Sequence, residues 1–422
     1  MVKKIFPLFL ALLLVFSFTG CKKQRLTDAE KEIVSKIHTE KQQKIDDIDW
    51  KEEDYSLVKL ENKIFKSESR NVEYNDGDVA ITKGGTYVLK GYYYGGIVVD
   101  TNDEVNLVFN TVQLFSNGEP AINVLNAKKV NIVLQEDTIN TINDKSVNEK
   151  ETGAITSNSD IFFIGGGALF IESLSTGIMC EKSVTFGDCS LDIIAGLNGV
   201  NAKKCIHCSG GSVGIYSVGN ALKGLEHIEV DGGYVQIKNA NEGLESLYID
   251  ILDGVVDIVS TEDGINGTDK REEADTENSN ALLTIKGGKI TIDAGGDGID
   301  VNGEIAMTGG TVIVYGTNNQ DEEIIDFDKT FEFDGGTIIC AGDHNMSWRL
   351  TTNKASALFV TGISFPENST IIITDNKNEK LLEFRNLKSF ETFYMVSDEL
   401  KNGGTYNMVS DSKTINNITA QQ

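Results

Sequence analysis

Proline, tryptophan and arginine are scarce in this sequence. Its 422 residues include 3 Pro and 2 Trp beside 42 Gly, and five residues are arginine. The apolar spacing that marks amphipathic helices is nearly absent after residue 50. A glycine-rich chain with little proline and no helical periodicity is typical of an all-β protein. A helical bundle is therefore excluded, and the length is sufficient for an extended core.

Positive charge is also in short supply. Lys and Arg number 38 against 64 Asp and Glu, which gives a net charge of −26. Such acidity argues against nucleic-acid binding and against direct attraction to anionic lipids or polysaccharides. A polyanionic partner would need cations between itself and the protein. Stacking on neutral sugars is the weaker alternative, because residues 92–94 are the one aromatic cluster.

Long hydrophobic runs are confined to the N-terminus. Lys3 and Lys4 precede an apolar stretch at 5–18 that is too short to span a membrane, so residues 1–20 resemble a lipoprotein signal peptide. The segment Phe-Thr-Gly-Cys ending at Cys21 resembles a bacterial lipobox. It predicts an extracytoplasmic lipoprotein that reaches the membrane, at the cell surface, only through a lipid on Cys21. The alternative is an ordinary signal peptide followed by an unmodified cysteine.

Residues 21–70 are predicted to form a tether that contains one short helix. Thr27 and Glu30 form a capping box ahead of spaced isoleucines, so we expect the helix at 27–47.

The most abundant pattern is a repeat of about 22 residues between 198 and 326. Each unit contains a polar residue, a small residue, an aliphatic residue and a second polar residue, as in Glu242-Gly-Leu-Glu245 and Asp297-Gly-Ile-Asp300. A second glycine marker and a short alternating run follow about ten residues later. Short strands joined by glycine corners at this period predict a β-solenoid, whose turns stack because none can bury its apolar face alone.

We expect this parallel β-helix to span residues 71–345 with about ten coils. Hairpin strands between 356 and 394 then predict a small β cap over residues 346–422, which would cover the open sheet edge. Superposed repeats predict inward columns at Val184 and Phe186, Ile206 and Cys208, Ile228 and Val230, Leu283 and Ile285, Ile305 and Met307, and Phe331 and Phe333.

Stacking also creates two outward columns, with equivalent residues about 4.8 Å apart. The corner column precedes the small residue and contains Asn198, Asn220, Glu242, Asp263, Asp297 and Glu323. The strand column follows three residues later and contains Asn201, Lys223, Glu245, Asn266, Asp300 and Asp326. We call the part of both columns from residue 242 onward the acidic ladder: Glu242, Glu245, Asp263, Asn266, Asp297, Asp300, Glu323 and Asp326.

The acidic ladder predicts a calcium site. Two carboxylates about 5 Å apart repel by roughly 3 kcal/mol at an effective dielectric constant near 20, so either their pKa values rise or cations lie among them. Calcium prefers the oxygen ligands that such columns supply. The alternative is that Asp, Asn and Gly are simply the residues that corners prefer. That alternative explains the glutamates badly, because Glu is not a turn former.

The acidic insertion and a pair of cysteines can each be interpreted in more than one way. The acidic insertion at 268–280 either lends ligands to the ladder or is a solvated loop, and we favour the loop. Cys205 and Cys208 form a C-x-x-C pair that resembles zinc or redox chemistry. Their alternation along one strand directs Cys208 inward and Cys205 outward, so we favour a structural role over a disulfide or a metal site.

These residues resemble a bacterial carbohydrate-binding-domain lipoprotein family. The resemblance covers roughly residues 71–408 and is strongest at the corner that ends in Asp300. It implies a right-handed parallel β-helix related to calcium-dependent pectate lyases, which binds calcium and polygalacturonate-like polymers. The coils at 177–223 fit the family less well, because Asn, Met or Lys stand where acids are common.

Three functions remain open at this stage, and we favour the first. A binding module would hold an acidic polysaccharide at the cell surface through calcium. A polysaccharide lyase would need a base, for which Lys223 is the one candidate in the strand column, although a pair with Glu245 explains it better. A structural surface protein would use calcium only to stiffen the solenoid. The sequence does not predict an oligomeric state.

Overall fold

The computed structural model describes residues 55–116, 118–146, 152–271, 279–316, 323–342, 352, 354–411 and 413–422. These residues form 40 strands and no helix, so none of them belongs to a helix that could cross a membrane. The chain is therefore all-β over its described part, as predicted. The signal peptide, Cys21 and the helix expected at 27–47 lie outside the described residues.

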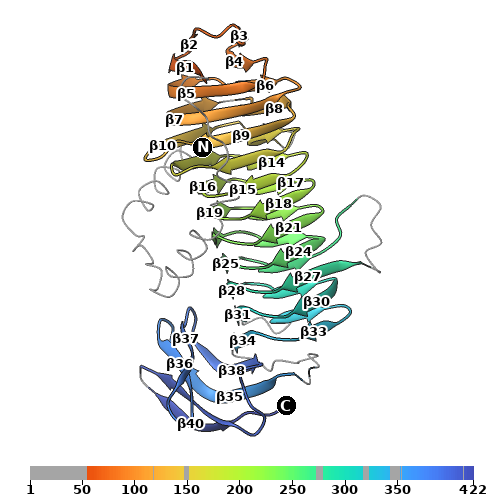
Figure 1. Ribbon diagram of the computed structural model, residues 1–422. Coiled ribbons are helices and arrows are strands. Elements are labelled where there is room, and N and C mark those ends of the chain that lie inside the picture. The colour runs from red at the N-terminus through yellow and green to blue at the C-terminus, as the bar shows by residue number, and fades with distance from the viewer. Residues whose placement is uncertain are drawn as a thin grey trace, which may run out of the picture.

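The strands stack as a tall column of coils (Figure 1), and each coil places strands on three faces. Face 1 is a 12-stranded sheet of β3 (Val72–Asn75), β4 (Asp78–Ile81), β6 (Ile97–Asp100), β8 (Ile122–Asn126), β11 (Gly153–Ser157), β14 (Thr176–Cys180), β17 (Val200–Ala202), β20 (Leu222–Gly224), β23 (Leu244–Ser246), β26 (Ile265–Gly267), β29 (Ile299–Val301) and β32 (Ile325–Phe327). Apart from the antiparallel pair β3–β4, its neighbouring strands are parallel.

The other two faces belong to one 24-stranded sheet, because β5 (Gly85–Tyr94) and β7 (Glu104–Ser116) run through both. Face 2 contains β9 (Lys129–Leu134), β12 (Ile161–Ile164), β15 (Val184–Phe186), β18 (Cys205–Cys208), β21 (His227–Val230), β24 (Tyr248–Ile251), β27 (Ala281–Ile285), β30 (Gly303–Met307) and β33 (Phe331–Phe333). Face 3 contains β10 (Ile139–Asp144), β13 (Ala168–Ser173), β16 (Ser190–Ala195), β19 (Ser212–Ser217), β22 (Tyr234–Asn239), β25 (Val255–Val259), β28 (Lys289–Asp293), β31 (Thr311–Tyr315) and β34 (Thr337–Gly342).

Glycine makes the turns between these faces possible. Gly233 turns the chain from face 2 to face 3 with φ +75°, in the left-handed region that other residues rarely adopt. A Cβ atom on Gly298, at the corner between faces 3 and 1, would lie 2.6 Å from the carbonyl oxygen of Ile324 in the next coil. Both glycine markers of the repeat therefore serve the close approach of neighbouring coils.

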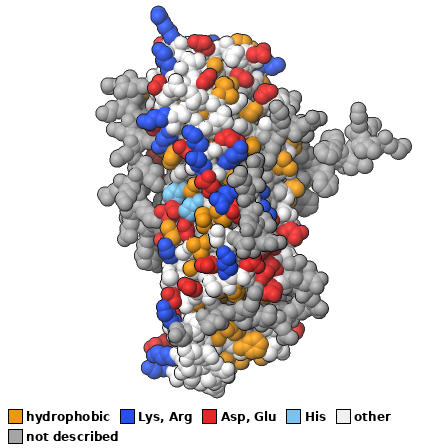
Figure 2. Space-filling view, turned by 90° about the vertical axis from the view of Figure 1, so that its right-hand side faces the viewer, with side chains coloured by type: hydrophobic (Ala, Val, Ile, Leu, Met, Phe, Trp, Pro, Cys, Tyr) orange, Lys and Arg blue, Asp and Glu red, His pale blue; other side chains and the backbone are white. Residues whose placement is uncertain are grey.

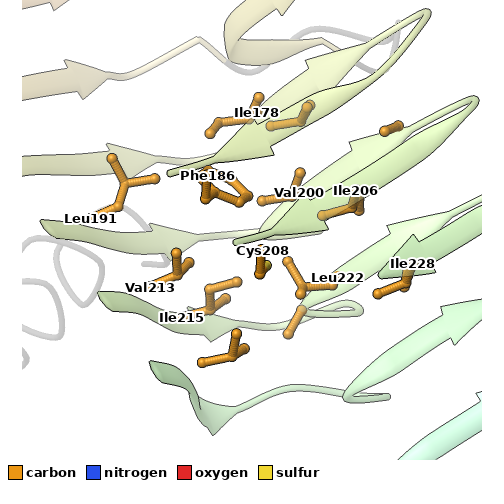
Figure 3. Packing of buried hydrophobic residues seen from close by; sticks show 14 of the residues in the cluster. Ile178, Phe186, Leu191, Val200, Ile206, Cys208, Val213, Ile215, Leu222 and Ile228 are labelled. Carbon is orange, nitrogen blue, oxygen red and sulfur yellow. The ribbon is translucent and has the colours of Figure 1, made fainter. Parts of the chain in front are cut away.

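The core is a continuous apolar column inside the three faces. Figure 3 shows side chains from all three faces pointing into this interior, among them Phe186, Val200 and Val213. The predicted inward columns are confirmed, since Ile206 pairs with Ile228 and every predicted member is buried. Aliphatic side chains recur at the same position on successive coils, so each coil packs on the next.

The sheet begins before residue 71, where we expected the β-helix to start. β1 (Tyr55–Asn62) pairs in parallel with β5, and β2 (Ile64–Ser67) folds back on β1 as an antiparallel hairpin. Val58 and Leu60 are buried in the main core. The boundary was misplaced because this segment lacks the glycine corners that mark the later coils.

A six-stranded unit follows the last coil. β38 (Phe390–Ser397) pairs antiparallel with β34 and with β35 (Ser356–Phe365), so it covers the edge of face 3. A second sheet contains β37 (Lys380–Arg385), β36 (Thr370–Asp375), β39 (Thr405–Ser410) and β40 (Thr414–Thr419). The last two strands lie beyond the hairpins that the sequence predicted, because β40 is mostly exposed and has little apolar alternation.

The continuous core predicts a large loss of stability on truncating a single inward side chain. Ile249→Ala removes a fully buried side chain from β24 and should lower the free energy of unfolding by about 2–5 kcal/mol. Val259→Ala, at a 42% exposed position in β25, is the control and should change it by less than about 0.5 kcal/mol. Thermal and denaturant unfolding measure both, and equal losses would contradict the assigned core.

Candidate functional site

Backbone hydrogen bonds stack the corners of successive coils directly on one another. The amide of Gly243 donates to the carbonyl of Asp263 at 3.0 Å, and the amide of Gly264 donates to that of Asp297 at 2.9 Å. The corner column of the sequence analysis is therefore a real column in space.

Side chains of the corner column help to hold this stacking. Asp263 Oδ1 accepts the amide of Asp297 at 2.9 Å, and Asp297 Oδ1 accepts the amide of Glu323 at 2.5 Å. Asn198 Oδ1 accepts the amide of Asn220 in the same way, at 2.9 Å. These oxygen atoms satisfy turn amides, as the corner alternative expects. The acids of this column thus have a structural role whether or not they also bind a cation.

The strand column is aligned by parallel pairing on face 1. Lys223 pairs with Glu245, Glu245 with Asn266, Asn266 with Asp300, and Asp300 with Asp326. The stacking predicted for this half of the acidic ladder is confirmed. Figure 2 shows the right-hand side of the molecule, where a group of acidic side chains gathers in the lower half.

Hydrogen bonds tie the N-terminal end of the acidic ladder together. Glu245 is only 4% exposed, and its Oε1 lies 2.8 Å from Lys223 Nζ. Asn220 Nδ2 donates to Glu242 Oε2 at 3.0 Å and to Glu245 Oε2 at 2.5 Å. The sequence analysis assigned Asn220 only a corner role, so this bridging amide was missed. Lys223 is engaged in an ion pair with Glu245, which confirms the interpretation that we preferred over a catalytic base.

The crowding of carboxyl groups shifts their pKa values. Burial, together with the neighbouring Glu245 and Asp263, raises the pKa of Glu242 to about 8. Burial and the charges of Asp263 and Asp326 raise the pKa of Asp300 to about 6. Although burial opposes it, hydrogen bonds with Glu242 and Lys223 lower the pKa of Glu245. The crowded carboxyl groups of Glu242 and Asp300 therefore retain protons at pH values where an isolated carboxyl is ionised, and a bound cation could replace those protons.

The acidic ladder contains a buried oxygen atom without a hydrogen-bond partner among the described residues. It is Oδ1 of Asn266, a residue that is 7% exposed. Unsatisfied buried acceptors are rare in proteins because each costs about 1–3 kcal/mol. An oxygen atom of this kind, between Glu245 and Asp300 in the strand column, suits a hard cation such as calcium.

The ladder side chains do not already converge as a closed metal centre. Over the part of the chain that the structure describes, the groups of three or more His, Cys, Asp or Glu side chains with ligand atoms within 4.8 Å of one another all lie on face 2. Calcium on face 1 would therefore need water or carbonyl oxygen atoms to complete its coordination, as calcium sites commonly have.

The start of the insertion at 268–280 folds against the ladder. Asp269 is buried, and its Oδ1 lies 2.8 Å from Arg271 Nε. Lys270 is exposed, and its charge helps to lower the pKa of Glu245 and partly opposes the rise in the pKa of Asp300. Residues 272–278, which contain most of the acids of the insertion, lie outside the described residues.

The C-x-x-C pair has the geometry that the strand alternation predicted. Cys208 is buried in the core, whereas Cys205 is partly exposed. Burial raises the pKa of the Cys208 thiol well above its usual value, which makes this thiol inert. The five described cysteines are all free, so none of them forms a disulfide with another.

Comparisons with known proteins match this chain to a family profile and to a solved structure. A family profile described as "Carbohydrate-binding domain-containing protein" matches residues 75–319 and 219–356. Among solved structures, the chain is similar to a polysaccharide lyase-like protein from C. thermocellum, determined as a gadolinium derivative. The sequence identity is 20% and the TM-score 0.46, over 60% of this chain and 96% of that chain. No curated protein matches the chain.

The raised pKa values predict that the metal-free protein loses stability as pH rises. A carboxyl group whose folded pKa is raised stabilises the fold fully below its unfolded pKa, and this contribution is lost as pH rises through the folded value. For Glu242 and Asp300 the window runs from about 4 to about 8. In chelator, the unfolding temperature should fall across this window.

Glu242→Gln and Asp300→Asn should each flatten that decline, because the amides do not ionise. Differential scanning calorimetry between pH 4.5 and pH 8.5 measures it. Glu332→Gln, at an exposed position on face 2, is the control and should keep the wild-type slope. Identical slopes in all four proteins would contradict the assigned shifts.

Proposed function

Since this chain belongs to the family of carbohydrate-binding domain-containing proteins, we propose that it binds an acidic, pectin-like polysaccharide through calcium ions held along the acidic ladder. The observation that carries this proposal is the strand column on face 1. It stacks Glu245, Asn266, Asp300 and Asp326 on consecutive coils in a chain of net charge −26.

The chemistry of the donors supports calcium in particular. Every ladder side chain offers oxygen, and calcium takes six to eight oxygen ligands at about 2.3–2.6 Å. Glu242, Asn266 and Asp300 are the best candidates, because two of them have raised pKa values and the third has an unpartnered oxygen atom. Glu245 already has Lys223 as its counter-ion, so Lys223 marks the N-terminal limit of the proposed site.

Calcium also removes an electrostatic obstacle. An acidic polymer and an acidic protein repel each other, whereas a bound divalent ion is the largest local charge and reverses the local field. Carboxylates of a polyuronate would then complete the coordination of ions that the ladder holds in part. A lipid on Cys21 would anchor the protein to the membrane and hold the acidic ladder outside the cell. The lipid anchor and the extracytoplasmic location are part of this proposal.

A structural role for calcium is the second candidate. The hydrogen bonds from the side chains of Asp263 and Asp297 to turn amides favour it, because they already use the corner column to join coils. Calcium would then stiffen the solenoid without engaging a glycan. We do not propose lyase activity, because Lys223 is paired with Glu245 and no described arginine lies in either column.

Loss of ladder charge should weaken calcium binding. Glu242→Gln combined with Asp300→Asn removes two carboxylates without removing the corner hydrogen bonds, and should lower calcium affinity at least tenfold. Isothermal titration calorimetry after chelator treatment measures it, and Glu332→Gln should bind as the wild type does. Equal affinity in the double variant would exclude the ladder as the calcium site.

Retention on a polygalacturonate gel should require calcium. The wild-type protein should be retained in calcium and elute in chelator, whereas the Glu242→Gln, Asp300→Asn variant should elute in both. Calcium-independent retention would reject bridging. Calcium binding without any retention would favour the structural candidate instead.

A further inference from the structure

Face 2 carries a second group of ligand side chains, outside the acidic ladder. Parallel pairing places His207 of β18 beside Glu229 of β21, and Glu229 beside Asp250 of β24. His227 lies two residues before Glu229 and therefore points to the same side of β21, and Asp231 follows directly after the strand. We call His207, His227, Glu229, Asp231 and Asp250 the histidine cluster.

The ligand atoms of this cluster are already close together. His207 Nε2 lies 3.2 Å from Glu229 Oε1 and 3.0 Å from Asp231 Oδ1. His227 Nε2 lies 2.9 Å from Asp250 Oδ2. Two groups of three residues have ligand atoms that all lie within 4.8 Å of one another, and Glu229 belongs to both. The first group adds His207 and Asp231, and the second adds His227 and Asp250. Two ligands bound tetrahedrally to zinc at about 2.0–2.1 Å lie about 3.3 Å apart, so little movement separates these contacts from a coordination shell.

The cluster is accessible from solvent. Side-chain exposures of its members are 27–31%, and Figure 2 shows both imidazoles at the surface beside acidic side chains. These are the two histidines in the part of the chain that the structure describes, out of four in the sequence. Metal ions and water can therefore reach donors that are held on three rigid, consecutive strands.

Ion pairing between histidine and carboxylate does not by itself balance the charge. Three carboxylates face two imidazoles, so the cluster has a charge of −1 even when both rings are protonated, and −3 when both are neutral. Lys286 contributes positive charge near Asp250, and Thr284 donates a hydrogen bond to it. Around His207, Glu229 and Asp231 share one imidazole.

The orientation of the His227 imidazole also suits metal binding. Cys205 Sγ lies 4.0 Å from Nδ1 of His227, while Nε2 faces Asp250. A ring whose Nδ1 contacts the protein and whose Nε2 faces an acidic group has a fixed orientation, as ligating histidines usually have. Strand alternation directs Cys208 into the core and Cys205 outward, where Cys205 lies beside His227.

We propose that the histidine cluster binds a divalent transition-metal ion of the zinc class, with His207, Glu229 and Asp231 as ligands. His227 and Asp250 form the adjoining half of the site and share Glu229 with it. Imidazole nitrogen with carboxylate oxygen is a donor set that selects zinc and its neighbours over calcium. A bound ion joins β18 and β21 from the outside, across the face opposite to their core packing.

Zinc chloride titration of the full chain tests this proposal by isothermal titration calorimetry, with calcium in excess so that the acidic ladder does not contribute. The wild type should bind zinc, and His207→Ala and Asp231→Asn should each lower the affinity at least tenfold. The His207→Ala, His227→Ala double variant should lose binding. Asp192→Asn, which removes a partly exposed acid of face 3 that is paired with Lys238, is the control and should bind as the wild type does.

Two further measurements separate metal ligation from damage to the fold. Cobalt(II) in place of zinc should give a visible absorption band in the wild type that His207→Ala abolishes. Circular dichroism and the unfolding temperature without zinc should remain close to those of the wild type in every variant. Zinc binding that survives in the double-histidine variant, or no zinc binding in the wild type, would overturn the proposal. Both outcomes leave the calcium proposal untouched, because it concerns other residues on face 1.

Discussion

The parallel hydrogen bonding between coils is the constraint from which the other features of this molecule follow. Corner amides donate to a neighbouring coil, as Gly243 does to Asp263 in the coil that follows and Tyr234 does to Gly211 in the coil before, and the coils cannot slip without losing rows of such bonds. Residues one repeat apart are therefore held at the spacing of neighbouring strands, about 4.8 Å. Inside, this stacks aliphatic side chains such as Ile228 on Ile249 and builds a core. Outside, it stacks like charges.

The repulsion between stacked carboxylates is offset in different ways along the chain. At the corners, one oxygen atom of Asp263 and one of Asp297 each accept a hydrogen bond from a turn amide. On face 1, Lys223 neutralises Glu245, whereas Glu242 and Asp300 keep raised pKa values. On face 2, His207 and His227 contact carboxylates of their own and neighbouring strands. Only the uncompensated positions need an external cation, which is why sequence acidity alone overstates the extent of a site.

Sequence analysis predicted the features that recur in every coil and missed those that occur once. The corner and strand columns and the inward core could be predicted because each position recurs with similar chemistry. The histidine cluster could not be predicted in that way, because His207, Glu229 and Asp250 occupy one column with three different side chains. The repeat register that assigned Cys208 to the core also aligns His207 with Glu229, but we used it only to assign the cysteines. The start at β1 was missed because no glycine corner marks it.

The two groups of proposed ligands meet on one coil. Residues 242–251 supply Glu242 and Glu245 to the acidic ladder on face 1 and Asp250 to the histidine cluster on face 2. From this coil the ladder continues toward the C-terminus, whereas the cluster extends toward the N-terminus. Solenoid stability is approximately a sum of single-coil and neighbour terms, so an ion stabilises mainly the coils that it touches. The proposed calcium site, with its oxygen donors, and the proposed zinc-class site, with nitrogen and oxygen donors, would thus divide the column into two segments that bind different classes of cation.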